Sequence, residues 1–305
     1  AAGCAGIGEG TAEARRQPRP TDSMVPGGIL DTHTHFYDPS RPQGVPWPGK
    51  DDKFLYRTVL PHEIRSIAQP LGVTGTIVVE ASPWVEDNDW VLKLAEREPF
   101  IEGLVGHLKP GRPNFARDLE RFTSNEKFRG IRVGLWDIPL APENKQFITD
   151  LEQLALRRLS LDVIGNPEQM VRISQIAASI STLRIVIDHC AGVKVTGGMP
   201  DAEWTNSIQM IAQHENIFMK VSGLAEGTGR ENAAPRDVAF YKPVLDIIWD
   251  AFGEDRVIFG SNWPVSARFA DYWTVLEIVK QYFFAKSDRA AAKYFRANAR
   301  RVYLG

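Results

Sequence analysis

Short apolar runs that alternate with amphipathic segments constrain the fold of this chain more than any other feature of its sequence. Eight runs of strand length occur from residue 28 onward, most of them rich in Val, Ile, Leu and Phe. Several are apolar on both faces, which is typical of parallel strands that are covered on both sides. The predicted strands are 28–36, 75–81, 100–108, 128–135, 159–165, 184–191, 217–223 and 256–263.

Helical patterns lie between these runs, with apolar residues at helical spacing in 88–98, 167–180, 241–253 and 288–304. Asn166-Pro167 is a typical helix start. Eight strands alternating with helices predict an α/β fold, the (β/α)8 TIM-type barrel. No G-x-G-x-x-G follows a strand, which disfavours a dinucleotide-binding open sheet.

The predicted barrel is one domain over residues 28–305, since no linker divides that range. Residues 1–27 are small, polar and Pro/Gly-rich, and are predicted to be a flexible tail or leader remnant. "AAGC" resembles the end of an export signal, and a translation start at Met24 is the alternative. Both a cytoplasmic and an exported (periplasmic) location therefore stay open. Residues 37–60, rich in Pro and aromatic side chains, are predicted to be a loop after the first strand.

Charge excludes some classes of partner. The chain has 36 Lys and Arg against 38 Asp and Glu, a net charge of −2, and no broad basic field for nucleic acid or an anionic membrane. No run reaches the roughly 18 apolar residues that a membrane span needs. The two cysteines, Cys4 and Cys190, are too few for a disulfide framework. The expected partner is a small molecule, and a homo-oligomer stays open.

Two histidines end the first predicted strand. Side chains alternate along a strand, so Asp31, His33 and His35 are expected on one inward face, at the barrel mouth where active sites form. Imidazoles at i and i+2 can both reach one metal ion or one substrate carbonyl. A pair of hydrogen-bonded core histidines is the structural alternative. His189 ends the sixth predicted strand and makes a third imidazole at the mouth.

Other strand ends supply further candidates. Asn262 is expected to enter the mouth from the last strand, and Asp188 to point toward the helix layer. Glu80 is predicted on the inward face of the second strand. Arg132 is a candidate for holding a substrate carboxylate, Lys220 for a carboxylate or a ring oxygen, and rim ion pairs are the alternative for both. His107 is a further mouth candidate, whereas His62 and His214 are expected at the surface.

Four tryptophans lie at or beyond strand ends: Trp47, Trp84, Trp136 and Trp263. Apolar faces of this kind suit a sugar ring or a small aromatic acid, and packing beneath loops is the alternative.

The motifs "DTHTH", "IDH" followed by a small residue and Gly, "MKVSGL" and "GSNWPV" together resemble the amidohydrolase-related family also called amidohydrolase 2. The likeness is greatest to its sugar-acid lactonase branch and covers residues 28–305. It implies a distorted barrel with a hydrolytic site at the mouth. It further implies that His33, His35 and His189 polarise a lactone carbonyl, either directly or through a divalent metal such as zinc or manganese, with a metal-free site as the alternative.

One position departs from the family pattern. The resemblance implies Asp on the last strand, as a base toward water and often a metal ligand, but the residue here is Asn262. An amide does not take up a proton at neutral pH and is a poorer ligand. Glu80 or a neutral His33 or His35 is then a candidate base.

These observations predict a hydrolase of carboxylic-ester bonds that opens a small, anionic or sugar-derived lactone, as in carbohydrate metabolism. The expected catalytic residues are His33, His35, His189, Asn262 and Glu80. The expected substrate-binding residues are Arg132, Lys220, Trp263 and His107. A metal-dependent decarboxylase, a lactone isomerase and a non-catalytic binding barrel remain the alternatives.

Overall fold

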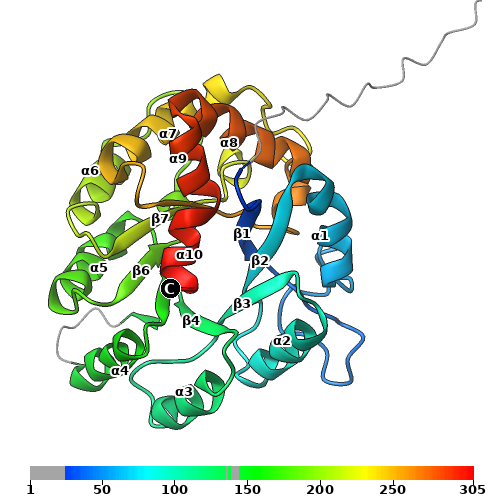
Figure 1. The fold of residues 1–305 in the computed structure, drawn as a ribbon, viewed down its shortest axis with the longest axis vertical. Coiled ribbons are helices and arrows are strands. Elements are labelled where there is room, and N and C mark those ends of the chain that lie inside the picture. The colour runs from blue at the N-terminus through cyan, green and yellow to red at the C-terminus, as the bar shows by residue number, and fades with distance from the viewer. Residues whose placement is uncertain (1–24, 135–136, 139–143) are drawn as a thin grey trace, which may run out of the picture.

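Eight parallel strands surround the centre of the molecule in a computed structural model that describes residues 25–134, 137–138 and 144–305. The strands pair in sequence order from β1 to β8 (Figure 1). The ring closes beyond β8, where Thr34 bridges to Trp263 and the His35 N–H donates to the Trp263 carbonyl at 3.0 Å. The predicted barrel fold is therefore confirmed. The strands are β1 Ile29–Thr34, β2 Val73–Val79, β3 Ile101–Gly106, β4 Phe128–Val133, β5 Ser160–Val163, β6 Arg184–Ile187, β7 Ile217–Val221 and β8 Val257–Phe259.

Helices form the outer layer around the strands (Figure 1). The helix predicted at 167–180 is observed as α5, and Asn166 caps it by accepting from the Glu168 N–H. The helices are α1 Pro61–Ala68, α2 Glu86–Arg97, α3 Phe115–Thr123, α4 Lys145–Leu156, α5 Pro167–Ser179, α6 Ala202–Ile211, α7 Val238–Phe252, α8 Tyr272–Lys286, α9 Asp288–Ala292 and α10 Asn298–Tyr303. None of the described helices has the length and apolar character that crossing a bilayer requires.

The C-terminal helix α10 closes one end of the barrel, and it crosses in front of the strands in Figure 1. Its Val302 and Tyr303 pack among side chains from strand starts and interiors, such as Leu30, Val186 and Ile258. All five are almost fully buried, and each such apolar side chain contributes about 1.5–3 kcal/mol of burial free energy. The opposite end, where the strands finish, is left for the site.

Strand β1 is irregular just before its histidines. Its pairing with β2 shifts register between Asp31 and Thr34. Asp31 consequently accepts a hydrogen bond from Tyr272 of the outer helix α8 at 3.0 Å, while His33 contacts residues inside the ring. The expectation that Asp31 shares an inward face with the histidines is wrong, because a register shift interrupts strict alternation.

Two expectations lie partly or wholly outside the described residues. The proposed tail is described only from residue 25, and Trp136 is not described. The two ends of the segment 37–60 pair with each other through a bridge between Tyr37 and Val59, and the segment carries Trp47 to the mouth.

Candidate active site

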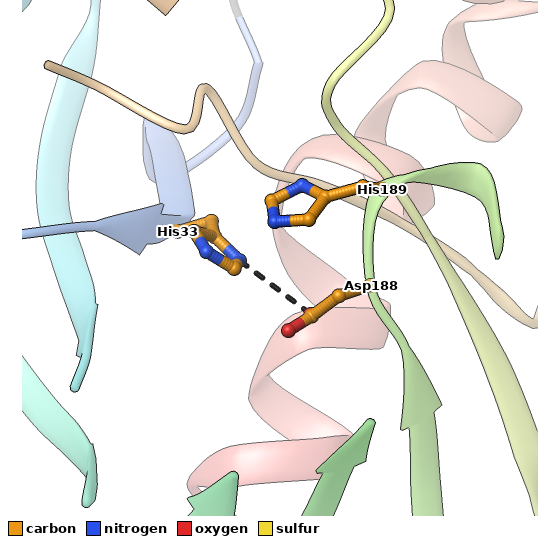
Figure 2. Close-up of side chains that lie close together, drawn as sticks. All are labelled: His33, Asp188 and His189. Carbon is orange, nitrogen blue, oxygen red and sulfur yellow. Dashed lines mark ion pairs between the residues drawn. The ribbon is translucent and has the colours of Figure 1, made fainter. Parts of the chain in front are cut away.

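Three histidines from distant parts of the chain meet at the open end of the barrel. The ring centroid of His33, on β1, lies 4.4 Å from that of His189, which follows β6 (Figure 2). The His35 centroid lies 5.0 Å from that of His33. The structure thus brings together the three imidazoles that the sequence placed there.

Two glycines make room for these rings. Gly260 lies directly after β8, and a Cβ added to it would lie 2.8 Å from the His33 Cβ. Gly223 has a φ of +69°, and its added Cβ would lie 2.9 Å from the His189 Cβ. Both distances are too short for any side chain, so glycine is required at these places in the motifs "MKVSG" and "FGSNW".

An unusual backbone turn aims two consecutive side chains inward after β6. His189, Cys190 and Ala191 all have positive φ, from 51° to 55°, a region that non-glycine residues seldom occupy. The Trp204 indole N–H supports the turn by donating to the Cys190 carbonyl at 2.8 Å. Asp188 and His189 therefore both face the interior (Figure 2), and the expectation that Asp188 points toward the helix layer is wrong.

Beneath the histidines lies a group of buried polar side chains that we call the charged layer: Asp162, Asp188, Lys220 and Tyr303. The Lys220 ammonium lies 2.7 Å from Asp162 Oδ2 and 2.9 Å from Asp188 Oδ1. The Tyr303 hydroxyl donates to Asp162 at 2.7 Å. Lys220 is fully buried and does not line the mouth cavity, so its charge supports the site from below.

Burial and charge oppose each other in this layer. Burial alone would raise the pKa of Asp188, but Lys220 and, to a lesser degree, His33 hold it well below its ordinary value. Burial alone would lower the pKa of Lys220, but Asp162 and Asp188 outweigh it and raise that pKa. Lys220 and Asp188 are therefore both charged at neutral pH.

The mouth histidines are neutral, in contrast. Burial lowers the pKa of His35 to about 3 and that of His189 to about 4. Burial also lowers the pKa of His33 well below its ordinary value, and that of His107. At pH 7 each ring therefore has one nitrogen that donates and one that accepts.

Hydrogen bonds orient two of these rings. His189 Nδ1 lies 2.9 Å from the Ser222 hydroxyl, which supports either tautomer because it both donates and accepts. His35 Nδ1 lies 2.9 Å from the Val79 carbonyl, which only accepts. His35 is thus fixed with its hydrogen on Nδ1 and a lone pair on Nε2.

A cavity of about 420 Å³ opens in front of the histidines. This volume suits a small-molecule ligand. Apolar and polar side chains both line it, and the polar ones converge from several strand ends. The lining residues are His35, Trp47, Glu80, Ala81, Ser82, Pro83, His107, Arg132, Gly134, Asp137, Ile164, His189, Asn262 and Val265.

Arg132 and Glu80 form an ion pair on the wall of this cavity. Arg132 Nε donates to Glu80 Oε1 at 2.9 Å, and an amino group of the guanidinium donates to the Glu80 carbonyl at 2.6 Å. The other carboxylate oxygen of Glu80 accepts from the Ser82 N–H at 2.8 Å. Glu80 is thus engaged at both oxygens, whereas the guanidinium keeps further N–H groups for a ligand.

The remaining candidates occupy different places. His107 lines the cavity, and its buried Nε2 has no hydrogen-bond partner within the described part of the chain. Trp47 lies at the cavity, 5.8 Å from His35 between ring centroids. Trp263 lines a neighbouring pocket, and its backbone closes the ring of strands. Trp84 is partly buried in the loop after β2. His62 is exposed, as expected, and His214 is partly buried against Ser174.

Asn262 leads to a residue that the sequence did not reveal. Its φ of 58° turns its amide into the mouth. The amide oxygen lies 3.2 Å from His35 Nε2, and the amide nitrogen donates to a carboxylate oxygen of Glu226 at 2.8 Å. We call Glu226 and Asn262 the rim pair. Glu226 belongs to the short helical turn Glu226–Thr228 after β7, where no motif marked it.

Burial raises the pKa of Glu226 to about 7. No Lys, Arg or His forms an ion pair with it in the part of the chain that the structure describes. A carboxyl of this kind is a functional candidate, because it changes charge near neutral pH.

A divalent cation fits one set of donors. His33, Asp188 and His189 each offer a ligand atom, and these atoms lie within 4.8 Å of one another. His33 Nε2 is buried with no hydrogen-bond partner among residues 25–134, 137–138 and 144–305. Two imidazoles and a carboxylate are a common donor set for zinc. Asp188 would be shared with Lys220. Both ring nitrogens of His35 have hydrogen-bond contacts, and the Asn262 amide is hydrogen-bonded to Glu226. Neither residue therefore belongs to this set of metal donors.

This barrel, with a cavity and converging histidines where its strands finish, has the architecture of TIM-barrel enzymes. The chain belongs to the amidohydrolase family (amidohydrolase 2), which it matches over residues 30–304.

Curated relatives and solved structures agree with this family. The chain is 30% identical over 285 residues to an L-fucono-1,5-lactonase of Burkholderia ambifaria, covering 90% of this chain and 94% of that one. It is 26% identical to an L-fucono-1,5-lactonase of Burkholderia multivorans, covering 87% of this chain and 90% of that one. A zinc-bound amidohydrolase from Burkholderia multivorans superposes with a TM-score of 0.78 at 24% identity, covering 90% of this chain and 99% of that one.

Proposed function

We propose that this chain is a hydrolase that opens the ester bond of a small lactone, derived from a sugar acid or bearing a carboxylate. The observation that carries the proposal is the meeting of neutral His35 and His189 with ion-paired Arg132 around one cavity. The two lactonases among its relatives, each matched over nearly its whole length, support the same reaction.

Substrate binding is assigned to the cavity walls. The free N–H groups of Arg132 suit a carboxylate or ring hydroxyls, and Glu80 serves the site by holding that guanidinium in place. A role for Glu80 as base would require it to leave this ion pair. Trp47 offers an apolar face to the ring, and the unpartnered His107 Nε2 offers a hydrogen bond to a hydroxyl.

The chemistry is assigned to the histidines. Water attacks the lactone carbonyl, and negative charge develops on the carbonyl oxygen. When no cation is bound, His189 stabilises that charge as a neutral donor, with its hydrogen on Nε2 and its Nδ1 accepting from Ser222. The ring C–O bond breaks, and the leaving oxygen takes up the proton that the attacking water gives up, so that the product carries a free hydroxyl and a carboxyl group. Asn262 remains a hydrogen-bonding group in this scheme, since its amide takes no proton.

We assign the cation position, when it is filled, to His33, Asp188 and His189. A bound zinc or manganese ion would supply a Lewis acid toward the carbonyl oxygen. Elemental analysis of protein purified without added metal tests this assignment. A metal content well below one ion per chain, with full activity, would show that the imidazoles suffice.

Product identity tests the proposed function. Purified protein is incubated with a panel of aldonolactones and carboxylated lactones, and the products are identified by NMR and mass spectrometry. Ring-opened hydroxy acids are the expected products. Release of carbon dioxide, or a shifted ring without uptake of water, would select the decarboxylase or isomerase alternative instead.

The non-catalytic alternative predicts a different pattern. A binding barrel would gain thermal stability from a lactone acid without forming product. N262D then serves as a discriminator, because hydrolysis that appears only in this variant would mark the natural chain as a silenced enzyme.

A further inference from the structure

The side-chain amide of Asn262 lies between His35 and Glu226. The hydrogens on these two partners must match the donor and acceptor ends of the amide. As the structure records the amide, Asn262 Oδ1 lies 3.2 Å from His35 Nε2, and Asn262 Nδ2 donates to Glu226 Oε1 at 2.8 Å. The oxygen and nitrogen ends of an amide exchange places by a half-turn about the last side-chain bond. The hydrogens on the two partners therefore decide which end faces which.

The contacts of His35 allow its hydrogen on only one ring nitrogen. The Val79 carbonyl requires the hydrogen on Nδ1, so neutral His35 presents a lone pair at Nε2. A lone pair needs a donor, and the only donor that Asn262 has is its amide nitrogen. Nδ2 must then face His35 and Oδ1 must face Glu226, which is the recorded amide after a half-turn about its last side-chain bond.

This orientation of the Asn262 amide in turn determines the protonation state of Glu226. Oδ1 of Asn262 and an ionised carboxylate are both acceptors and would repel each other at 2.8 Å. A protonated carboxyl donates instead, and completes an unbroken chain of hydrogen bonds from Glu226 through Asn262 and His35 to Val79.

The surroundings of Glu226 favour that protonated form. The titratable groups whose charges act with it are the Cys190 thiol, after β6, and the Tyr241 phenol, on α7. Burial raises the pKa of each to about 12, so both are neutral at pH 7. Within the described part of the chain, no cation therefore offsets the loss of water around the carboxyl.

We propose that Glu226 is a positioning residue of the mouth: its protonated carboxyl donates to Asn262 Oδ1 and thereby turns the Asn262 amide nitrogen toward His35 Nε2. The proposal extends the proposed lactonase function, on which its kinetic consequence rests. When Glu226 loses its proton to solvent, the carboxylate takes the amide nitrogen for itself. Asn262 Oδ1 then faces His35 Nε2, acceptor against acceptor, and His35 loses the hydrogen bond that holds its ring.

The kinetic consequence is an alkaline decline. Burial raises the pKa of Glu226 to about 7, so kcat/KM for an opened lactone is expected to fall above that pH. Loss of one buried hydrogen bond predicts a fall of about five- to tenfold.

Two substitutions test the proposal. Glutamine always carries a donor, so E226Q should keep kcat/KM at pH 6 within about threefold of the parent and should lose the alkaline decline. E226A has no donor and should be about five- to tenfold slower at pH 6, with no decline. E126Q, an exposed glutamate in the loop before β4, is the matched control and should keep the parent profile. An E226Q profile that still declines, or E226Q as slow as E226A at pH 6, would overturn the proposal.

A second readout is independent of lactone turnover. ¹⁵N NMR of the histidine rings should show His35 with its hydrogen on Nδ1, and its Nε2 signal should move as the pH passes about 7. E226Q should abolish that movement. If no lactone is opened but this titration is seen, the proposed function fails and the positioning role stands. If lactones are opened and the His35 signal is the same in parent and E226Q at every pH, the positioning role fails alone.

Discussion

The charged layer and the rim pair place carboxyl groups in the same barrel, and one cation makes the difference between them. Asp188, in the charged layer, lies 2.9 Å from the Lys220 ammonium, which helps hold its pKa well below the ordinary value. Glu226, in the rim pair, contacts the Asn262 amide and has no ion pair among the described residues, and burial raises its pKa to about 7. Burial alone thus does not decide the pKa of an acid: Lys220 outweighs it at Asp188, whereas at Asp162, beside the same lysine, burial and the charge of Asp188 still raise the pKa.

This contrast separates two tasks. Within the charged layer, Lys220 and Asp188 keep their charges under the histidines near neutral pH, because each holds the other in its charged form. The rim pair holds a group that titrates where the enzyme is proposed to work. Lys220, Asp162 and Asp188 are therefore expected to govern stability, and Glu226 to govern the response of activity to pH.

The largest expected effect comes from removing the cation of the charged layer. K220M leaves Asp162 and Asp188 buried without their partner, and should lower the free energy of unfolding by about 3–5 kcal/mol. Urea unfolding measures the loss, with K53M at an exposed lysine as control. Should K220M not fold, D162N is the milder test, with an expected loss of about 1–3 kcal/mol. A change below about 1 kcal/mol in both would show that the ion pairs do not stabilise this layer.

A large effect on activity is expected at His189, which belongs neither to the charged layer nor to the rim pair. H189A removes the neutral donor assigned to the carbonyl oxygen, and kcat/KM should fall about a hundredfold. The exposed His62 provides the control variant H62A, whose kinetics should stay at the parent level. An H189A enzyme within about threefold of the parent would remove His189 from the mechanism.

A smaller effect, on substrate choice, is expected at Arg132. R132K keeps the positive charge but loses the planar fork that Glu80 orients. KM for a carboxylated lactone should rise about tenfold, with little change for a neutral lactone. Steady-state kinetics on the two substrates side by side measure the difference. An equal change in both would mean that Arg132 does not bind a carboxylate.

The smallest effect concerns stability at the rim. Because folding raises the pKa of Glu226 from 4.5 to about 7, its contribution is complete below pH 4.5 and is lost as the pH rises through 7. E226Q lacks this loss, so it should gain about 1 kcal/mol over the parent between pH 6 and pH 8. Thermal unfolding at both pH values, with E126Q as control, checks the gain. A difference between parent and E226Q that is the same at both pH values would contradict the shift.

Much of the fold and the meeting of the histidines could be predicted from the sequence. The apolar runs indicated all eight strands, and the strand ends indicated where His33, His35 and His189 converge. These features depend on hydrophobic periodicity and on the rule that barrel sites form where strands finish.

Side-chain directions were less predictable where the backbone is irregular. Asp31 and Asp188 both point the other way from the expected one, because of a register shift in β1 and a left-handed turn after β6. Strict alternation does not survive either feature, and no glycine between His189 and Ala191 signalled the second.

Two further residues differ in how far the sequence could have revealed them. A lysine inside an apolar strand, such as Lys220 in "FMKVSG", must be buried together with carboxylates. Asp162 in "LSLDVIG" is likewise a charged residue inside an apolar strand, and so indicates a buried ion pair. Glu226 lies in a loop whose letters carry no periodicity, so only its contact with Asn262 identifies it.

The most direct test of lactone hydrolysis at this mouth is the initial rate of acid release from a panel of small lactones at constant pH, for the parent and H189A side by side. We predict that the parent accelerates ring opening of at least one sugar-acid or carboxylated lactone, and that H189A does so about a hundredfold more slowly. A parent protein that opens no lactone faster than buffer, with or without added zinc or manganese, would contradict the account.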